Sequence, residues 1–599
     1  MKLSSLYANK SEYFDPVYFA TGLNVILAEI RLPENKKKDT HNLGKTTLGH
    51  LIDFCLLLGR DPRFFLFKHY DRFKEFVFFI EIEILDGTFV TVRRRVEEPS
   101  KISFKKHKMR KQDFTALSHT KWDHVDVPFE RAKDLLDGLL DLSALKPWSY
   151  RKGLGYLIRS QDDFRDVFQL KKFASVHSDW KPYLAHILGF NAKLITDHYD
   201  REDDLIRKQE TAQTLRTELG GSIEDLSKIE GMLLLKQKEV DKRQKRLDAF
   251  DFRLQDKKKT RELVEEIDQN ISRLNSERYY LMQNDKKISS ALEETQILFD
   301  PDEAQRLFKD AGILFEGQIK RDFEQLIAFN RAITNERRDY LIEESKEIEN
   351  ELKRINAELN DLGKRRSQVL SFLSNTDPVM KYKEFAGEMV SLKADIASLE
   401  RQRGYLQRLQ ELRKDIRKIT DEKDHLQAKI EEDVEKQNTS SDSLFSSIRV
   451  YFSEIIEEVI DRQALLTVSP NKEGHLEYKA EILDESGKAT SAGVGHTYQK
   501  LLCIAFDMAV ARAHINDRFP HFIFHDGVFE SLDDRKKDNL INVIRRYTDM
   551  GIQHIITLID SDLPSHLKMA NTPIFEESEI VLRLHDENER GRLFKMKSW

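Results

Sequence analysis

The hydrophobic and polar positions divide the 599-residue chain into three regions of different pattern. Residues 1–198 contain short apolar runs, and two of these runs alternate apolar with polar residues on either side of Asp86-Gly87, which predicts a β-hairpin. Residues 199–440 are rich in charge and nearly free of proline, whereas residues 441–599 return to the apolar runs of a globular fold. The pattern therefore predicts two globular parts with a helical domain between them.

The middle region carries a heptad-like stripe of apolar residues. Their spacings are mostly three, four or seven, and charged residues lie between them over several heptads. Two supercoiled helices bury a seam of this kind, whereas an ordinary amphipathic helix would end sooner. We therefore expect a coiled coil. The positions are Ile267, Ile271, Leu274, Leu281, Ile288 and Leu292, and later Met389, Leu392, Ile396, Leu399, Leu406, Leu409, Leu412, Ile416, Ile419, Leu426 and Ile430.

Two groups of helix breakers interrupt the stripe. The first includes Pro301, Gly312 and Gly317 and lies close to the midpoint of the region, near residue 320; the second lies at 374–378. Proline and glycine end or bend helices. We expect an ascending arm, an apical element at about 298–330 and a returning arm with an elbow at 374–378. The two globular parts would then lie side by side.

A phosphate-binding loop is indicated near the N-terminus. Gly44-Lys45-Thr46 follows an apolar strand and precedes a helical pattern, although Asp39 stands where the motif has its first glycine. Backbone N–H groups at the start of such a helix hold phosphates, a lysine adds a compact positive charge, and a hydroxyl binds Mg²⁺. The residues expected to contact a nucleotide are Asn42, Leu43, Gly44, Lys45, Thr46 and Thr47.

The C-terminal region contains a partner for this loop. An apolar strand ends at Asp526, which is the pattern of a carboxylate that binds the water shell of Mg²⁺. Asp533 follows seven residues later. A strand that ends in aspartate is common, but one matched to a phosphate-binding loop across a coiled coil predicts a nucleotide site.

These motifs resemble the ABC-type ATPase heads of SMC-like proteins. The resemblance implies an α/β P-loop head assembled from both chain ends, with a long antiparallel coiled coil inserted between them, that binds ATP and Mg²⁺. It implies that Gln161 in "YLIRSQDDF" is a ligand for Mg²⁺ and the attacking water. It also implies that Ser491 and Gly493 contact the γ-phosphate held by a second head, and that Asp533 is the D-loop aspartate.

A narrower resemblance rests on residues 311–341 and on "HDGVFESLDDRKK". They look like a bacterial SMC-like family found in multi-component anti-phage or anti-plasmid defence systems, Lamassu-type among them. The implied partners are a second copy of the chain through ATP-sandwiched heads, DNA in the form of ends or structured duplex, and accessory subunits. An effector such as a nuclease would be a separate chain, because the sequence shows no nuclease constellation.

The sequence departs from the family at the catalytic positions. Gly527 follows Asp526, where the family has a catalytic glutamate. Glu530 is the candidate substitute, because a loop could place its carboxylate in the site. Ile559 stands where a switch histidine is expected, and His525 and His554 are interpreted as packing residues. We expect an ATPase whose hydrolysis is slow or dependent on a partner. A nucleotide-binding switch or scaffold that recruits effectors with little hydrolysis is the alternative.

Composition limits the remaining classes. The net charge of −6 argues against a globally basic nucleic-acid binder, although residues 93–95 and 105–111 are locally basic. Cys55 and Cys503 lie far apart in apolar runs, which suggests neither a disulfide framework nor a zinc site. No apolar segment long enough to serve as a leader or membrane span is evident, so a cytoplasmic protein with no membrane partner is expected.

Overall fold

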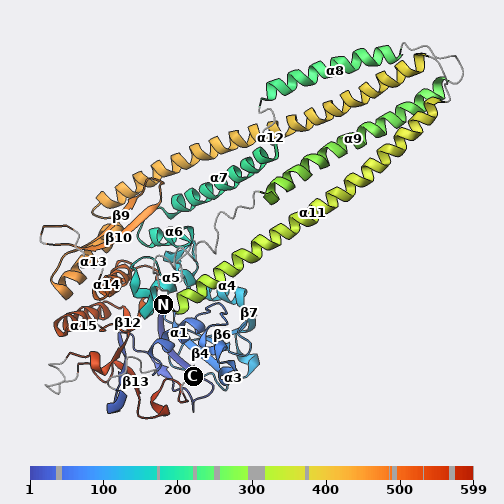
Figure 1. Cartoon of the computed structure of the whole chain (residues 1–599). Helices are drawn as coiled ribbons and strands as arrows, with labels where there is room; N and C mark the ends of the chain where they lie inside the picture. The colour runs from blue at the N-terminus through green and yellow to red at the C-terminus, as the bar shows by residue number, and fades with distance from the viewer. Residues whose placement is uncertain are drawn as a thin grey trace. The chain divides into compact units, whose positions relative to one another are not determined.

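The computed structural model of the chain describes residues 1–35, 43–170, 176–219, 225–248, 257–293, 317–371, 377–484, 486–488, 495–530, 532–564 and 574–597. Its contacts define two compact units. The first, which we call the head, comprises Met1–Glu202 and Glu422–Trp599, and the second, the arm, comprises Asp203–Asp421 (Figure 1). Both ends of the chain therefore belong to one unit.

The head contains a parallel sheet to which both ends of the chain contribute. Its strand order is β13-β3-β12-β11-β8, and every neighbouring pair is parallel. Since β3 lies between β12 and β13, neither end of the chain can complete the sheet alone, and the predicted assembly of an α/β head from both ends is confirmed. The strands are β3 (Leu23–Glu29), β8 (Ile158–Arg159), β11 (Phe522–His525), β12 (Gln553–Ile559) and β13 (Ile580–His585).

The head also contains an antiparallel sheet of order β2-β1-β4-β5-β6-β7. Its strands β4 and β5 are the predicted hairpin, in which Glu83 faces Phe89 and Gly87 adopts a φ of 78°, an angle that favours glycine. The hairpin predicted from the alternating pattern is confirmed. The strands are β1 (Lys2–Ala8), β2 (Val17–Tyr18), β4 (Val77–Glu83), β5 (Phe89–Arg95), β6 (Lys101–His107) and β7 (His124–Pro128).

Helices and one small hairpin pack on these sheets. Helix α1 approaches β11 so closely that a Cβ atom on Gly49 would lie 2.6 Å from the ring of Phe524. This glycine therefore lets the helix that begins at Lys45 lie against the strand that ends beside Asp526. The elements are α1 (Lys45–Cys55), α2 (Phe65–Lys68), α3 (Tyr70–Phe73), α4 (Phe129–Leu140), α5 (Tyr150–Leu157), α6 (His177–Ile187), α13 (Leu444–Ile460), α14 (His496–Ala513) and α15 (Asp534–Asp549), with the hairpin β9 (Ala464–Pro470) and β10 (Leu476–Ile482).

Two arginines fix the C-terminal end of α1. The buried Arg94 donates from Nη1 to the carbonyl oxygens of Phe54 and Leu58, and Arg151 donates from Nη1 to that of Leu56. Cations at this end of a helix satisfy its free carbonyl groups and interact favourably with its dipole. They hold α1 in place, so that its N-terminal end is fixed relative to the parallel sheet.

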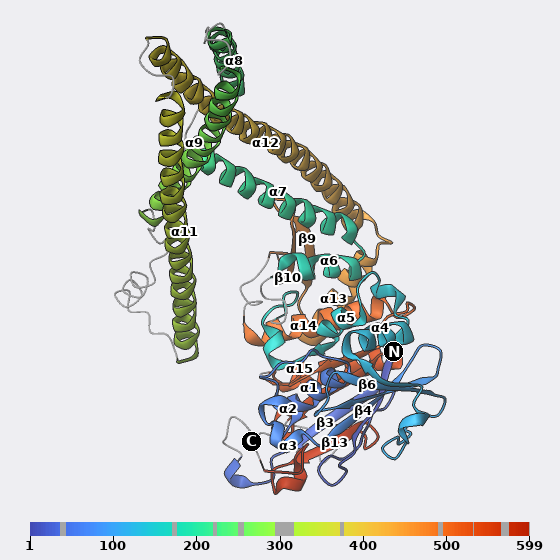
Figure 2. The ribbon, with the colours of Figure 1, turned by 90° about the vertical axis from the view of Figure 1, so that its right-hand side faces the viewer.

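The arm consists of long helices that pair antiparallel. The ion pairs Lys208–Asp415 and Lys236–Asp395 show that α7 and α8 run antiparallel to α12, because the partner number falls as the residue number rises. Hydrogen bonds and ion pairs also join α9 to α11, with Asp285 opposite Ser345 and Asp268 opposite Arg366. The helices are α7 (Ala192–Leu219), α8 (Leu226–Asp248), α9 (Lys257–Glu293), α11 (Gly317–Ser371) and α12 (Asp377–Thr439) (Figure 2).

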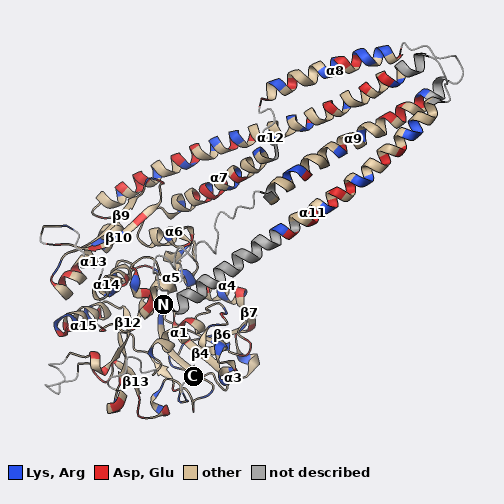
Figure 3. Ribbon diagram, viewed as in Figure 1, with Lys and Arg blue, Asp and Glu red and all other residues tan. Residues whose placement is uncertain are grey.

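The heptad stripe forms the buried seam of these pairs, which confirms the predicted coiled coil. One cluster joins Ala212 of α7 and Ile229 of α8 to Leu399, Leu406 and further leucines of α12. Basic and acidic residues alternate along the described parts of the arm helices (Figure 3). The predicted stripe residues that the structure buries are Leu274, Ile288, Met389, Leu392, Leu399, Leu406, Leu409, Leu412, Ile419 and Ile430.

Helix α8 ends at Asp248 and α9 begins at Lys257, while α11 ends at Ser371 and α12 begins at Asp377. A cluster of Leu247, Val264, Leu370 and Tyr382 joins these four helix ends. Arg401 of α12 also donates from Nη2 to the carbonyl oxygen of Ser276 of α9 at 2.9 Å, so the α9–α11 pair contacts α12 as well. Of the elbow predicted at 374–378, residues 374–376 lie outside the described residues. Of the predicted apical element, residues 298–316 lie outside the described residues.

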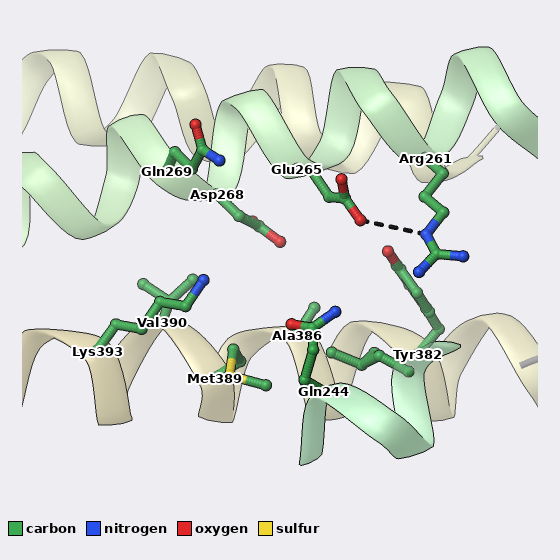
Figure 4. A pocket seen from close by; sticks show the side chains of 11 residues that line it. Gln244, Arg261, Glu265, Asp268, Gln269, Tyr382, Ala386, Met389, Val390 and Lys393 are labelled. Carbon is green, nitrogen blue, oxygen red and sulfur yellow. Dashed lines mark hydrogen bonds and ion pairs between the residues drawn. The ribbon is translucent and has the colours of Figure 1, made fainter. Parts of the chain in front are cut away.

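A cavity of about 200 Å³ lies beside this cluster, between α8, α9 and α12 (Figure 4). Glu265 and Asp268 of α9 point towards the side chains of α12, which include Lys393. Burial raises the pKa of Asp268, and the guanidinium of Arg366 acts in the opposite direction. The cavity is thus lined by a mixture of charged and apolar side chains, and no group of three or more potential metal ligands occurs among the described residues.

Among the described residues, no helix is both long and apolar enough to cross a membrane.

Candidate functional site

The phosphate-binding loop meets the parallel sheet at the start of α1. Gly44 caps the helix with φ 105° and ψ 15°, and Lys45, Thr46 and Thr47 form its first turn. A left-handed φ of this size favours glycine, so the sequence Gly-Lys-Thr suits this turn. Leu43 is buried next to it, whereas Asn42 and Asp39 lie outside the described residues.

The structure brings Thr46 and Asp526 together across 480 residues of sequence. The Thr46 hydroxyl donates from Oγ1 to Oδ2 of Asp526 at 2.5 Å. The other carboxylate oxygen of Asp526 accepts from the Thr557 hydroxyl at 2.5 Å, and that hydroxyl in turn accepts from the N–H of Gly527 at 3.0 Å. Asp526 is fully buried, so these contacts fix the carboxylate that faces Thr46.

Gln161 and Glu530 form a second pair beside Asp526. The amide of Gln161 donates from Nε2 to Oε1 of Glu530 at 2.6 Å. Gly527 adopts a φ of +69°, and a Cβ atom there would lie 2.7 Å from Oε1 of Glu530 and 2.8 Å from Nε2 of Gln161. The space that a side chain at position 527 would need is therefore occupied by the carboxylate of Glu530 and the amide of Gln161.

Lys45 lies among these charged groups. Burial lowers the pKa of Lys45, and nearby Lys500 acts in the same direction, whereas the carboxylates of Asp526, Glu530 and Asp562 oppose the shift. A partly desolvated ammonium group close to several carboxylates gains from the arrival of a further anion. The site therefore combines a positive helix N-terminus, a lysine and hard oxygen donors.

Lys500 and Thr557 are site residues that sequence reasoning missed. Lys500 of α14 is 1% exposed, and its Nζ donates to the carbonyl oxygen of Gly527 at 2.8 Å and lies 3.4 Å from Oε2 of Glu530. Lys500 directly precedes the apolar run "LLCIAF". This position was a signal for a buried contact, because lysine is almost never fully buried without a partner. Thr557 carried no comparable signal within its apolar strand.

A buried polar network lies behind the site. Asp507 of α14 binds Arg159 through two contacts of 2.8 Å and accepts from Nε2 of His525 at 3.0 Å. Nδ1 of His525 lies 3.0 Å from Nε2 of His554. The arrangement that satisfies these contacts has two neutral imidazoles, with His554 donating to His525 and His525 donating to Asp507. The predictions that His525 and His554 are packing residues fit these positions.

Other candidate residues lie elsewhere or outside the described residues. Asp533 is the N-cap of α15, where its carboxylate accepts from the N–H of Lys536 at 3.1 Å and pairs with the Lys536 ammonium group. Hydrogen bonding from Lys536 lowers the pKa of Asp533. Ser491 and Gly493 lie outside the described residues. Their predicted contact with a second head stays a prediction.

The locally basic segments are largely engaged within the head. Lys105 pairs with Asp123 at 2.6 Å and Lys106 with Asp86 at 2.8 Å. Arg110 donates to the hydroxyl of Ser4 and to a backbone carbonyl. Of residues 93–95, Arg94 is buried at the end of α1. The charges of Lys105 and Lys106 are therefore neutralised locally, whereas Arg94 and Arg110 bind neutral oxygen acceptors.

A family model described as an uncharacterised protein conserved in bacteria (DUF2326) matches residues 455–598. No curated protein matches the chain.

Among solved structures, the chain resembles three SMC head domains. The Smc head domain with a coiled coil and joint from Pyrococcus yayanosii is 15% identical, with a TM-score of 0.35 over 95% of this chain and 93% of that one. The Smc head domain with an extended coiled coil bound to the C-terminal domain of ScpA from Pyrococcus furiosus is 12% identical, with a TM-score of 0.31 over 95% and 92%. The SmcHead bound to the C-winged helix domain of ScpA is 11% identical, with a TM-score of 0.31 over 97% and 96%. At these sequence identities and TM-scores, a functional assignment has to rest on the residues of this chain.

The neutral histidine pair makes the stability of the head sensitive to acid. Burial lowers the pKa of His554 well below its usual 6.5, so below pH 6.5 the unfolded chain binds a proton that the folded chain does not. As the pH decreases below 6.5, the free energy of unfolding should therefore decrease by up to about 1.4 kcal/mol per pH unit for this group. His554→Gln should reduce that slope because it keeps a donor for His525 but cannot titrate.

Urea unfolding between pH 7 and pH 5 checks this expectation. Fluorescence reports on the head, since Trp122, Trp148 and Trp180 all belong to it. The substitution His119→Gln, which removes an exposed histidine outside the buried network, provides the control variant. An equal slope in the wild type and His554→Gln would contradict the assignment of a neutral buried imidazole.

Proposed function

We propose that this chain is an SMC-like ATPase that binds ATP with Mg²⁺ at the head. The observation that carries the proposal is the 2.5 Å contact between the Thr46 hydroxyl and the Asp526 carboxylate. It joins the loop after β3 to the end of β11, and the Gln161–Glu530 pair lies beside it. The carboxyl ends of strands in an open parallel sheet are where such folds bind ligands.

The residues present fit both ATP and Mg²⁺. Thr46, Asp526 and Gln161 offer hydroxyl, carboxylate and amide oxygen atoms, which are the donors that Mg²⁺ prefers. Lys45 and the N–H groups from Leu43 to Thr47 offer positive charge and hydrogen-bond donors for the phosphates. When bound, Mg²⁺ neutralises the charge that develops on the phosphate oxygens. The hydroxyl–carboxylate hydrogen bond keeps the two oxygen groups of Thr46 and Asp526 close together.

Glu530 is the proposed general base in place of the residue at position 527. Gln161 holds one of its oxygens at 2.6 Å, and Lys500 lies 3.4 Å from the other. A carboxylate held in this way can accept a proton from a water that Gln161 orients. Because Gln161 and Lys500 engage both oxygens of Glu530, the carboxylate has to give up one of these contacts to reach a water molecule, which favours slow turnover.

Lys45→Ala should weaken nucleotide binding at least tenfold, because it removes the positive charge that faces the phosphates. Titration with the fluorescent analogue mant-ATP in Mg²⁺ buffer measures the Kd. Lys68→Ala, which removes an exposed lysine of α2, is the matched control and should bind as the wild type does. Equal affinity of wild type and Lys45→Ala would exclude a nucleotide at this site.

Glu530→Gln should lower kcat by about 100-fold or more and change the Kd for mant-ATP by less than about threefold. The amide keeps the shape of the carboxylate but cannot take the proton. Phosphate release measures kcat, and Glu477→Gln on the exposed face of β10 serves as control. Unchanged turnover in Glu530→Gln would assign the base to another residue.

A nucleotide-binding switch with little hydrolysis is the second candidate. The observation that favours it is the engagement of Glu530 by both Gln161 and Lys500, together with Gly527 at the usual glutamate position. Such a switch would bind ATP, change shape and recruit effector proteins without turnover. ATP turnover of the wild type with and without DNA separates the two candidates, since a switch would show none in either condition.

We further propose that two heads sandwich ATP and that closure is coupled to DNA sensing within an anti-phage or anti-plasmid defence complex. The resemblance to SMC-like proteins suggests the sandwich, with Ser491 and Gly493 of one copy facing Lys45 of another. Separate effector and accessory subunits complete the proposed complex. The Asp123 and Asp86 ion pairs of Lys105 and Lys106 leave the basic run 105–111 a weaker candidate for the DNA contact.

Ser491→Arg should prevent ATP-dependent dimerisation, because a bulky cation would fill the space intended for the γ-phosphate. Sedimentation velocity with Mg²⁺ and ATP, in the Glu530→Gln background that slows hydrolysis, measures the dimer fraction. Ser441→Arg on the exposed loop after α12 is the control and should still form dimers. Equal dimer fractions in the two variants would refute the sandwich.

A further inference from the structure

The segment that follows β13, residues 586–597, runs along the phosphate-binding loop. β13 pairs with β3 in parallel, from Ile580 opposite Val25 to His585 opposite Glu29. The two strands therefore end side by side, and the residues that follow each strand remain close. The segment is held to the rest of the head by hydrogen bonds at several points, which the next paragraphs describe in order.

Asp586 holds the chain just after β3. Its Oδ1 accepts from the N–H groups of Arg31 at 2.8 Å and Leu32 at 3.1 Å, and its Oδ2 accepts from the side-chain amide of Asn35 at 2.8 Å. A carboxylate that accepts several N–H groups makes stronger hydrogen bonds than a neutral acceptor. Glu587 makes an exposed ion pair with Arg31 at 3.0 Å, and its carboxylate lies 3.4 Å from Nδ1 of His585.

Leu593 holds the chain just before α1. Its N–H donates to the carbonyl oxygen of Leu43 at 3.0 Å. In a trans peptide the carbonyl and the next N–H point in opposite directions, so this bond turns the N–H of Gly44 away from the segment. A Cβ atom on Gly44 would also lie 2.6 Å from the Cβ of Leu593, so the segment covers one side of Gly44 and leaves the other for a ligand.

The segment is firmly anchored beyond Leu593. Phe594 is 1% exposed and packs among phenylalanines, with its ring centroid 5.0 Å from that of Phe73 and 5.3 Å from that of Phe14. The N–H of Lys595 donates to the carbonyl oxygen of Tyr13 at 2.9 Å, and Arg72 donates to the carbonyl oxygen of Lys597 at 3.0 Å. The backbone at Leu593 is therefore held in place, and so is the Leu43 carbonyl group that accepts its hydrogen bond.

We propose that residues 586–594 are a positioning element of the nucleotide site, in which Leu593 and Asp586 fix the two flanks of the phosphate-binding loop. This inference rests on the proposed function of that loop. Leu593 fixes the orientation of the peptide group between Leu43 and Gly44, whose N–H points to the nucleotide phosphates. Asp586 fixes the backbone position of the residues that directly follow β3. Ordering both flanks before the ligand arrives reduces the entropy that binding would otherwise cost.

The test compares Leu593→Pro with Leu593→Ala by mant-ATP titration. Proline lacks the N–H that holds Leu43, whereas alanine keeps it and loses only side-chain contacts. Arg592 is extended, with φ −92° and ψ 157°, a conformation that tolerates a following proline. We expect the Kd to rise at least tenfold in Leu593→Pro and at most threefold in Leu593→Ala, with melting temperatures of the nucleotide-free variants within about 3 °C of one another.

A second pair of variants tests the other flank of the loop. It also keeps the inference testable if Leu593→Pro fails to fold. Asp586→Ala removes three hydrogen bonds to Arg31, Leu32 and Asn35, whereas Glu587→Ala removes one exposed ion pair. We expect the Kd to rise three- to tenfold in Asp586→Ala and to stay unchanged in Glu587→Ala. Equal Kd values in these two variants, or in Leu593→Pro and Leu593→Ala, would overturn the inference.

The Lys45→Ala variant separates this inference from the proposed function. If the wild type and Lys45→Ala bind mant-ATP equally, the proposed nucleotide site itself is wrong. If Lys45→Ala loses binding but Leu593→Pro and Asp586→Ala bind as the wild type does, the site is real and the positioning role of residues 586–594 is wrong.

Discussion

The hydrogen bond between Thr46 and Asp526 is the contact on which the organisation of the chain depends. It can form only if β3 and β11 belong to one sheet, and β12 lies between them. Residues of the arm therefore have to leave the head and return to it, which an antiparallel arm of paired helices achieves. Gly49 allows the close approach of α1 to Phe524 that brings the two side chains within 2.5 Å. A long insertion costs little in loop-closure entropy once its own helices pair.

Gly527 stands where the SMC-like pattern expected from the sequence has a glutamate, and its backbone conformation bears on the position of Glu530. The left-handed conformation at Gly527 turns the chain so that Glu530 returns to the site, where Gln161 binds it. A larger residue at 527 would collide with both of these groups. In the proposed site, Gly527 and the carboxylate of Glu530 thus take the place of one glutamate, and the left-handed φ at position 527 favours glycine over alanine.

Local sequence patterns predicted the local structure. The features that the sequence did not predict are contacts between segments far apart in the chain. The Asp86-Gly87 hairpin, the helix that starts at Lys45 and the seam from Met389 to Ile430 each have a short-range signal in turn chemistry or periodicity. Lys500 gave only the weak signal of a charge in an apolar run. Leu593 gave none, because a backbone N–H leaves no mark on the sequence.

Helix α14 connects the parts of the site most directly. Lys500 and Asp507 are seven residues apart, about two turns, and so share one face of the helix. The first binds the Gly527 carbonyl beside Glu530, and the second binds Arg159, which lies two residues before Gln161. Because both contacts are buried, a shift of α14 must either move Glu530 and Gln161 with it or leave Lys500 and Arg159 without partners, which costs several kcal/mol.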